Sequence, residues 1–330
     1  MKVLVAGATG ALGRQILPRL IEAGHEVAGT TTRPDKQAQL QAMGATPFVM
    51  DGLDGESVGT AVAAFEPEVI VHELTALSSV DMRDFEGSFA LTNRLRTQGT
   101  DHLLAAGRAV GIKRFVAQSF AGWPYARIGS LVKTEEDALD PEPIAPMRDT
   151  LAAIRHLENA VVGADWTEGV VLRYGGLYGP GTSAGDIVEM IRRRQFPILG
   201  GGAGIWSFVH VEDAADATAL AVERGPRGIY NIVDDEPTPS GVFIPAIAEA
   251  LGAKPPLRIP AWLGRLLAGT VVVTMMTEGR GSSNAKAKRE LGWQPIWPSW
   301  RDGFRHGLDT PVPLATPGRA RTPAKETSAA

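Results

Sequence analysis

The sequence predicts an α/β fold built on a doubly wound parallel sheet, with a smaller and discontinuous second domain in the C-terminal part of the chain. Short apolar runs alternate with amphipathic stretches over the first two thirds of the 330 residues. Such alternation is typical of a parallel sheet with helices on both faces. The runs are apolar almost throughout, as expected for strands that are covered on both sides.

Six apolar runs are predicted to be buried strands. In chain order they read KVLVAG, EVAGTT, TPFVM, VIVHEL, RFVAQS and GVVLRYG. Between them lie four stretches with helical periodicity, which are Leu12–Ala23, Ser57–Phe65, Arg94–Val110 and Thr150–Val162. Each helix can return the chain to the start of the next parallel strand.

The composition of the chain changes after Tyr174. The glycine-rich loops YGGLYGPGTSAGD and FPILGGGAGIW flank a basic helix, and FVHVEDAADATALAVERG and GIYNIVDD then fit the sheet domain again. The sequence therefore predicts a sheet domain of residues 1–172 and 205–235 and a second domain of residues 173–204 and 236–308. Residues 309–330 are rich in Pro, Thr and Ala without an apolar period, and we expect them to form a disordered tail.

Composition excludes several functions. The net charge is −4 and no basic block stands out, so we expect no nucleic-acid partner. There is no cysteine, which rules out disulfides and thiolate sites, and the six histidines are scattered, so no metal site is expected. The run WLGRLLAGTVVVTMM contains Arg265 and is shorter than the roughly 20 residues of a membrane span. We expect a cytoplasmic protein without a membrane partner.

The loop GATGALG follows the first predicted strand and carries Gly7, Gly10 and Gly13. One glycine permits the tight turn, one lets the backbone approach a pyrophosphate, and one packs the helix against the strand. The helix N-terminus then offers free N–H groups to the phosphates. The sequence therefore predicts a Rossmann-type dinucleotide-binding domain, and the alternative is a glycine turn without a ligand.

The end of the second strand indicates which dinucleotide is bound. An acidic residue there would bind the ribose 2′-hydroxyl of NAD, whereas an arginine suits the 2′-phosphate of NADP. The stretch GTTTRPDK has no acid at the strand end, and Arg33 lies 20 residues after Gly13. We therefore expect NADP rather than NAD, with an added charge from Arg14. The alternative is that Arg33 is a solvated turn residue.

Seven segments in order resemble the extended and atypical short-chain dehydrogenase/reductases, the NAD-dependent epimerase/dehydratase group. They are GATGALG, MDGLD, VIVHELTAL, GTDHLLAAGRAVGIKRFVAQS, LRYGGLYGPG, FVHVEDAA and SNAKAKRELGW, and the resemblance covers about residues 1–308. It implies that Asp51 meets the adenine. Together with the glycine loop and Arg33, it implies cofactor contacts from Gly7, Thr9, Gly10, Ala11, Leu12, Gly13, Arg14, Arg33, Asp51, Gly52, Thr75, Ser119, Tyr174, Gly175 and Leu177.

The catalytic residues of that family are not found at the aligned positions of this sequence. Its hydride-transferring members usually carry a Tyr-x-x-x-Lys pair, and alignment places Met147 and Leu151 there, or Pro146 and Thr150 after a shift of one residue. No tyrosine of this chain is followed by lysine at that spacing. The family's Ser or Thr after the fifth strand falls at Phe120 or Ala121.

Two further positions depart from the family pattern. Arg96 stands in place of the asparagine of Asn-x-x-Gly-Thr, and Trp206 stands where nucleotide-sugar enzymes have an arginine. Aromatic and methionine side chains could instead line a largely apolar substrate pocket, and the alternative is that they are core residues. The candidate lining residues are Trp123, Met147, Trp206 and Met276.

Four residues are candidates for the missing acid or base. Tyr125 follows the fifth strand, and Asp149 flanks the vacant tyrosine position beside Arg148. Tyr178 lies in LYGPG, and His210 has a suitable unperturbed pKa for proton transfer. Each also has a structural alternative. Tyr125 could be a loop aromatic and Asp149 part of a solvated helix start, whereas Tyr178 could serve packing and His210 could be structural.

Three functions remain open. The first is an NADP(H)-dependent, atypical short-chain dehydrogenase/reductase-like oxidoreductase that acts on a small, fairly apolar substrate with non-standard acid/base residues. The second is an NAD-dependent nucleotide-sugar epimerase or dehydratase, and the third is a redox-silent dinucleotide-binding regulator. The first predicts an open pocket at the nicotinamide end, lined by Trp123, Tyr125, Met147, Tyr178, Trp206 and His210. We expect a small-molecule substrate and allow for a homodimer.

Overall fold

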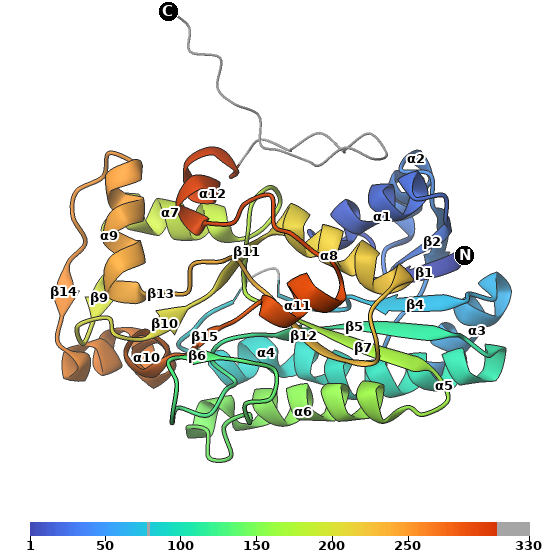
Figure 1. Ribbon diagram of the computed structural model, residues 1–330, viewed down its shortest axis with the longest axis horizontal. Coiled ribbons are helices and arrows are strands. Elements are labelled where there is room, and N and C mark those ends of the chain that lie inside the picture. The colour runs from blue at the N-terminus through green and yellow to red at the C-terminus, as the bar shows by residue number, and fades with distance from the viewer. Residues whose placement is uncertain (78–79, 309–330) are drawn as a thin grey trace, which may run out of the picture.

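The computed structural model describes residues 1–77 and 80–308, and its centre is a seven-stranded sheet (Figure 1). All neighbouring strands are parallel, in the order β12-β7-β5-β4-β1-β2-β3. Their bounds are β1 (Lys2–Ala6), β2 (Glu26–Thr31), β3 (Thr46–Val49), β4 (Val69–His72), β5 (Arg114–Phe120), β7 (Glu168–Tyr174) and β12 (Gly228–Ile232). The order reverses between β1 and β4, so the predicted Rossmann-type doubly wound fold is confirmed.

Helices cover both faces of the sheet. One face packs against α1 (Gly13–Glu22), α2 (Gln37–Ala42), α8 (Val211–Glu223) and α11 (Ala285–Glu290). The other face packs against α3 (Gly55–Phe65), α5 (Thr100–Val110) and α6 (Arg148–Gly163). In Figure 1, α1 and α8 lie above the sheet and α5 and α6 below it. All the strands except the edge strand β3 are therefore largely buried from both sides, as their apolar sequences require.

The predicted helix Arg94–Val110 is interrupted in the structure. Helix α4 (Phe85–Arg94) leads into a π-helical turn, η2 (Leu95–Gly99), and α5 starts only at Thr100. The Thr100 hydroxyl donates to the Arg96 carbonyl at 2.7 Å within this turn. Hydroxyl groups that bond back to the preceding turn compete with the regular helix ladder. This irregular turn carries Arg96 and recurs in the site described below.

A separate hydrophobic cluster forms beside the carboxyl edge of the sheet, on the left of Figure 1. Its helices are α7 (Ala184–Arg192), α9 (Ser240–Ala250), α10 (Ala261–Glu278) and α12 (Trp300–His306). Two short strand pairs belong to this region, β9 (Ile198–Leu199) with β14 (Arg258–Ile259) and β10 (Ile205–Trp206) with β13 (Thr238–Pro239). The predicted division into two domains stays a prediction, and residues 309–330 lie outside the described residues.

Two further strand pairs join distant segments at this edge. They are β8 (Gly176–Tyr178) with β11 (Phe208–His210), and β6 (Val132–Lys133) with β15 (Gly281–Ser282). A short 3₁₀ turn, η3 (Ala145–Met147), leads into α6, and another, η1 (Pro34–Lys36), precedes α2. Within the described residues, no helix has the length and apolar character to cross a membrane, and no three His, Asp or Glu side chains are grouped to hold a metal ion.

Candidate functional site

The glycine loop between β1 and α1 has no room for side chains at two positions. Gly7 adopts a φ of +92°, and a Cβ there would lie 2.7 Å from the Glu73 carbonyl oxygen. A Cβ at Gly13 would overlap the Gly7 carbonyl. The start of α1 is thereby held against the end of β1, which is the arrangement that a pyrophosphate requires.

Donors are left open at this helix start. The backbone N–H groups of Ala11 and Leu12 donate to no other group within the described part of the chain. Arg14 is exposed on the first turn of α1, and a Cβ at Gly181 would lie 2.8 Å from its Nη2 atom. The Gly179–Gly185 segment therefore passes beside the loop. Open N–H groups and a cation at a helix N-terminus fit the phosphates of a dinucleotide.

The end of β2 offers threonines and an arginine rather than an acid. Thr30 is buried, and its hydroxyl accepts the Gly7 N–H at 3.3 Å. Arg33 is two-thirds exposed and donates through Nη2 and Nε to Asp35, at 2.8 and 3.2 Å. This hydrogen bonding lowers the pKa of Asp35. Sequence reasoning missed the pairing, although an acid two residues after Arg33 was the available signal.

The remaining predicted cofactor contacts lie along the carboxyl edge of the sheet. Asp51 and Thr75 are exposed after β3 and β4, and Gly52 is buried against Leu74. At the end of β7, a Cβ at Gly175 would lie 2.7 Å from the Ser207 carbonyl oxygen, and Leu177 is partly buried. Their cofactor contacts stay predictions.

A buried carboxyl group lies directly beneath the glycine loop. Glu73 accepts a hydrogen bond from the Tyr174 hydroxyl at 3.0 Å, and that hydroxyl lies 2.7 Å from Thr218 Oγ1. Burial raises the pKa of Glu73 to about 8. The carboxyl is therefore protonated at neutral pH, so it adds little negative charge below the expected phosphate position.

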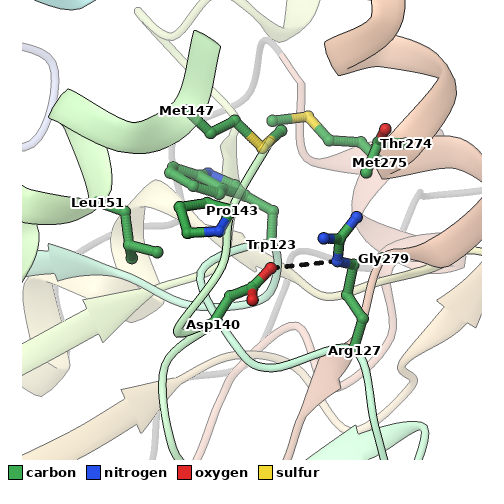
Figure 2. Close-up of a pocket in the computed structure, with 9 residues that line it drawn as sticks. All are labelled: Trp123, Arg127, Asp140, Pro143, Met147, Leu151, Thr274, Met275 and Gly279. Carbon is green, nitrogen blue, oxygen red and sulfur yellow. Dashed lines mark hydrogen bonds and ion pairs between the residues drawn. The ribbon is translucent and has the colours of Figure 1, made fainter. Parts of the chain in front are cut away.

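A hollow lies between the loop after β5, the start of α6 and the end of α10 (Figure 2). The space inside it that a water molecule can occupy is about 10 Å³. Its walls are mainly apolar, and the polar end is an ion pair of 3.1 Å between Arg127 and Asp140. The lining residues are Trp123, Arg127, Asp140, Pro143, Met147, Leu151, Thr274, Met275 and Gly279.

Two of the four predicted pocket residues line this hollow. Trp123 and Met147 face it, as Figure 2 shows. Trp206 packs against the cluster that contains Met147 but does not line the hollow. Met276 is buried in the separate cluster beside the sheet, and its neighbour Met275 lines the hollow instead.

Of the four candidate acids and bases, only Tyr178 and His210 lie together, and they do so away from the hollow. The buried Tyr125 hydroxyl donates to Asn231 at 2.7 Å and accepts from Arg173 at 2.8 Å. Tyr178 and His210 are buried with ring centroids 5.1 Å apart, and His210 donates to the Gly307 carbonyl at 2.8 Å. Asp149 is exposed in the first turn of α6. None of the four lines the hollow, and their catalytic roles stay predictions.

A buried ionic cluster lies below the carboxyl edge of the sheet, and most of it was not predicted from the sequence. Arg173 donates to both oxygens of Glu158, at 2.7 and 2.6 Å, and the Ser119 hydroxyl donates to the same carboxylate at 2.7 Å. Burial opposes the charge, but these hydrogen bonds and the attraction of Glu158 raise the pKa of Arg173. Arg96 is also buried nearby, and burial lowers its pKa to about 10. Only Ser119 and the unusual Arg96 stood out in the sequence.

Comparisons with known proteins agree with this geometry. Residues 3–233 match the NAD dependent epimerase/dehydratase family. A 3-diazoavenalumate denitrifying reductase of a Streptomyces species is 42% identical over 312 residues, which span 92% of this chain and 99% of the relative. The Thermus thermophilus UDP-glucose 4-epimerase with NAD has a TM-score of 0.70 at 24% identity, covering 93% and 98% of the two chains. A human epimerase family protein with NADPH has a TM-score of 0.72 at 20% identity, covering 93% and 99%.

Proposed function

The chain belongs to the NAD dependent epimerase/dehydratase family and is an NAD(P)-dependent oxidoreductase, and on that premise we propose that it uses NADPH to reduce a small aromatic carboxylate that bears a diazo group. The observation that carries this proposal is the identity of 42%, over nearly the whole of both chains, with a denitrifying reductase of a diazo acid. The apolar side chains Trp123, Met147 and Met275 at the hollow suit an aromatic ring in their chemistry, and the hollow must widen to admit one.

The proposed reaction explains why a Tyr-x-x-x-Lys pair is dispensable. NADPH held at the glycine loop would supply a hydride for a new C–H bond, while the C–N bond would break and its electron pair would leave with dinitrogen. An aryl diazonium ion and NADPH would thus become the arene, N₂ and NADP⁺. Reduction of a carbonyl leaves an alkoxide that must be protonated. Here the leaving group is a neutral gas, and the carbon that receives the hydride requires no proton. The chain then has to bind the substrate, orient it and exclude water from it.

The residues at the glycine loop fit the cofactor. Gly7 and Gly13 leave the backbone free to approach the pyrophosphate, and Ala11, Leu12 and Arg14 offer donors and charge. We propose NADP rather than NAD because β2 ends in threonines followed by Arg33. The Arg33–Asp35 pair is exposed, so water screens it and the guanidinium can exchange Asp35 for a phosphate at small cost.

A nucleotide-sugar epimerase is the less favoured alternative. Such an enzyme needs a cation for the diphosphate of its substrate and an acid/base pair for the sugar. Trp206 stands at the position where the sequence resemblance expects that cation, and Tyr178 and His210 are buried away from the hollow. The regulator hypothesis is set aside because the chain is an oxidoreductase.

Incubation of the full chain with NADPH and 3-diazoavenalumate tests the proposal. We expect NADPH oxidation, release of N₂ measured by mass spectrometry, and formation of the denitrified acid in equal amounts. UDP-glucose with NAD serves as the comparison and should not be converted. Tight binding of NADPH without N₂ release from the diazo acid would contradict the proposed substrate.

A further inference from the structure

Two buried arginines share a single carboxylate below the carboxyl edge of the sheet. Glu158 already accepts three hydrogen bonds, two from Arg173 and one from Ser119. Arg96 is only 2% exposed, and its Nε and Nη1 atoms donate to no group of the described residues. Glu158 attracts the Arg96 charge without a direct hydrogen bond. The cluster of Arg96, Ser119, Glu158 and Arg173 therefore has one positive charge in excess.

This cluster lies where a ligand of a doubly wound sheet is expected. Ser119 is the residue before the last of β5, and Arg96 acts electrostatically on His72, the last residue of β4. Ligands of such sheets bind outside the carboxyl ends of the strands, near the point where the strand order reverses. The strand order reverses between β4 and β1, and the cluster lies at the neighbouring strands β4 and β5.

The π-helical turn explains how Arg96 reaches this position. The turn η2 packs between α4, α5 and α6, and Glu158 faces it from α6. The Thr100 hydroxyl, which donates to the Arg96 carbonyl, also lies 3.1 Å from His72 Nε2. Burial, followed by the charge of Arg96, lowers the pKa of His72 to about 4, so this histidine is neutral and adds no second charge.

An arginine in this state requires a partner. A buried guanidinium without hydrogen bonds is costly, and buried polar groups are almost always paired in folded proteins. No carboxylate among the described residues supplies that partner, because Glu158 is engaged by Arg173 and Ser119. An oxyanion of a bound molecule would complete the cluster with charge-assisted hydrogen bonds.

We propose that the Arg96 guanidinium binds an oxyanion of the substrate, either a ring oxygen or the carboxylate, beside the place where hydride is delivered. This inference rests on the proposed function for the identity of the substrate as an aromatic acid. A ring oxygen conjugated with the reacting carbon gains negative charge when hydride arrives, and a fixed buried cation stabilises such charge more strongly than water does. Arg96 would then be a specificity-determining residue that selects anionic aromatic ligands.

A chromogenic phenol tests this proposal without any hydride transfer. The full chain saturated with NADP⁺ is titrated with 4-nitrophenol, whose phenolate absorbs visible light, over a range of pH. Because Arg96 would stabilise the phenolate over the phenol, the bound probe should ionise about one pH unit or more below the free probe. Benzoate, which has a carboxylate and no phenol, should displace the probe if the carboxylate is the bound oxyanion and should leave it in place if the ring oxygen is.

Four variants separate binding from folding. Arg96→Met should abolish the ionisation shift, and Arg96→Lys should retain part of it because the charge stays and the fork is lost. Glu158→Gln should enlarge the shift, since Glu158 is the carboxylate among the described residues whose charge attracts Arg96. Arg114→Met is the matched control, because Arg114 donates to three backbone carbonyls at the start of β5, at the opposite edge of the sheet. It should leave the shift unchanged.

The wild-type titration and the variants can each contradict the proposal. Failure of the wild-type chain to bind 4-nitrophenolate at millimolar concentration would overturn the proposal, as would a full shift in folded Arg96→Met. If Arg96→Met does not fold, an unchanged or smaller shift in Glu158→Gln overturns it. The probe carries no diazo group, so a normal shift with no reduction of 3-diazoavenalumate would refute the proposed function and leave the oxyanion site standing.

Discussion

Arg33 and Asp35 show how one surface ion pair bears on cofactor choice. Arg33 stands where the sequence predicts a 2′-phosphate contact, and in the structure its guanidinium donates to Asp35 through two nitrogens. A phosphate and Asp35 would therefore compete for the same donors. We therefore expect Asp35 to weaken, but not to remove, the preference for NADP that Arg33 alone predicts.

Substitution of these two residues should change NADPH binding in opposite directions. Arg33→Ala should weaken NADPH binding by roughly tenfold or more, because a charge-assisted hydrogen bond is lost, and should leave NADH binding unchanged. Asp35→Ala should leave NADPH binding equal or tighter, because the competing carboxylate is removed. Fluorescence titration of both cofactors measures these effects. Equal binding of NADH and NADPH by the wild-type chain would show that the NADP assignment is wrong.

At the scale of elements, the junction of β1 and α1 depends on the absence of a single Cβ atom. Gly13→Ala would push a methyl group into the Gly7 carbonyl and the Ala8 backbone, which cannot move without shifting β1 or α1. We expect a lower free energy of unfolding and loss of dinucleotide binding. Thermal unfolding with and without NADPH measures both.

A second glycine provides the matched control for this element. Gly59 lies within α3, and a Cβ there would meet nothing within 4 Å. Gly59→Ala should stabilise the chain by about 0.5–1 kcal/mol through the helix preference of alanine, with NADPH binding unchanged. If Gly13→Ala behaved like Gly59→Ala, the glycine loop would not have the close packing that we assign to it.

The sequence predicted elements well where a periodic pattern covers the whole segment. All six expected strands are present, and most of them are apolar runs that are buried between two packed layers. The break at Leu95–Gly99 was not predictable from periodicity, since a π-helical turn shifts the apolar pattern by one residue and retains helical composition. Glu158 lies on an amphipathic helix and Arg173 within an apolar strand, so no local signal marks their pairing.

The candidate site was predictable only in part. The glycine loop and Arg33 follow from local spacing, and the structure places them at the ends of β1 and β2 as expected. Trp123 and Met147 meet at the hollow, whereas Tyr125 turns to Arg173 and Asn231. Which side of a loop a side chain faces depends on tertiary packing, and one aligned position does not encode it.

At the scale of the whole molecule, buried carboxyl groups tie stability to pH. Burial raises the pKa of Glu73 to about 8, that of Asp234 to about 8 and that of Asp213 to about 7. Each group binds more protons in the folded chain than in the unfolded chain between its usual pKa and the raised value. The free energy of unfolding should therefore fall as pH rises from about 5 to 8.

Glu73→Gln isolates the buried carboxyl group that lies beneath the glycine loop. The amide is neutral at every pH, so the variant should unfold with nearly the wild-type free energy at pH 5 and be more stable at pH 8, by on the order of a few kcal/mol. Urea denaturation at several pH values measures this difference. Glu66→Gln changes an exposed glutamate and should follow the wild-type pH profile. A loss of stability in Glu73→Gln that is equal at pH 5 and pH 8 would contradict the protonation assigned to Glu73.

The central claim is that this oxidoreductase delivers hydride to an acceptor that needs no protein acid. The most direct test is a single turnover of 3-diazoavenalumate with NADPH deuterated at both hydrogens of nicotinamide C4, followed by mass spectrometry and NMR of the product. We predict one deuterium on the carbon that carried the diazo group, and no deuterium at that carbon when unlabelled NADPH reacts in D₂O. Deuterium at that carbon from D₂O rather than from the cofactor would contradict the account.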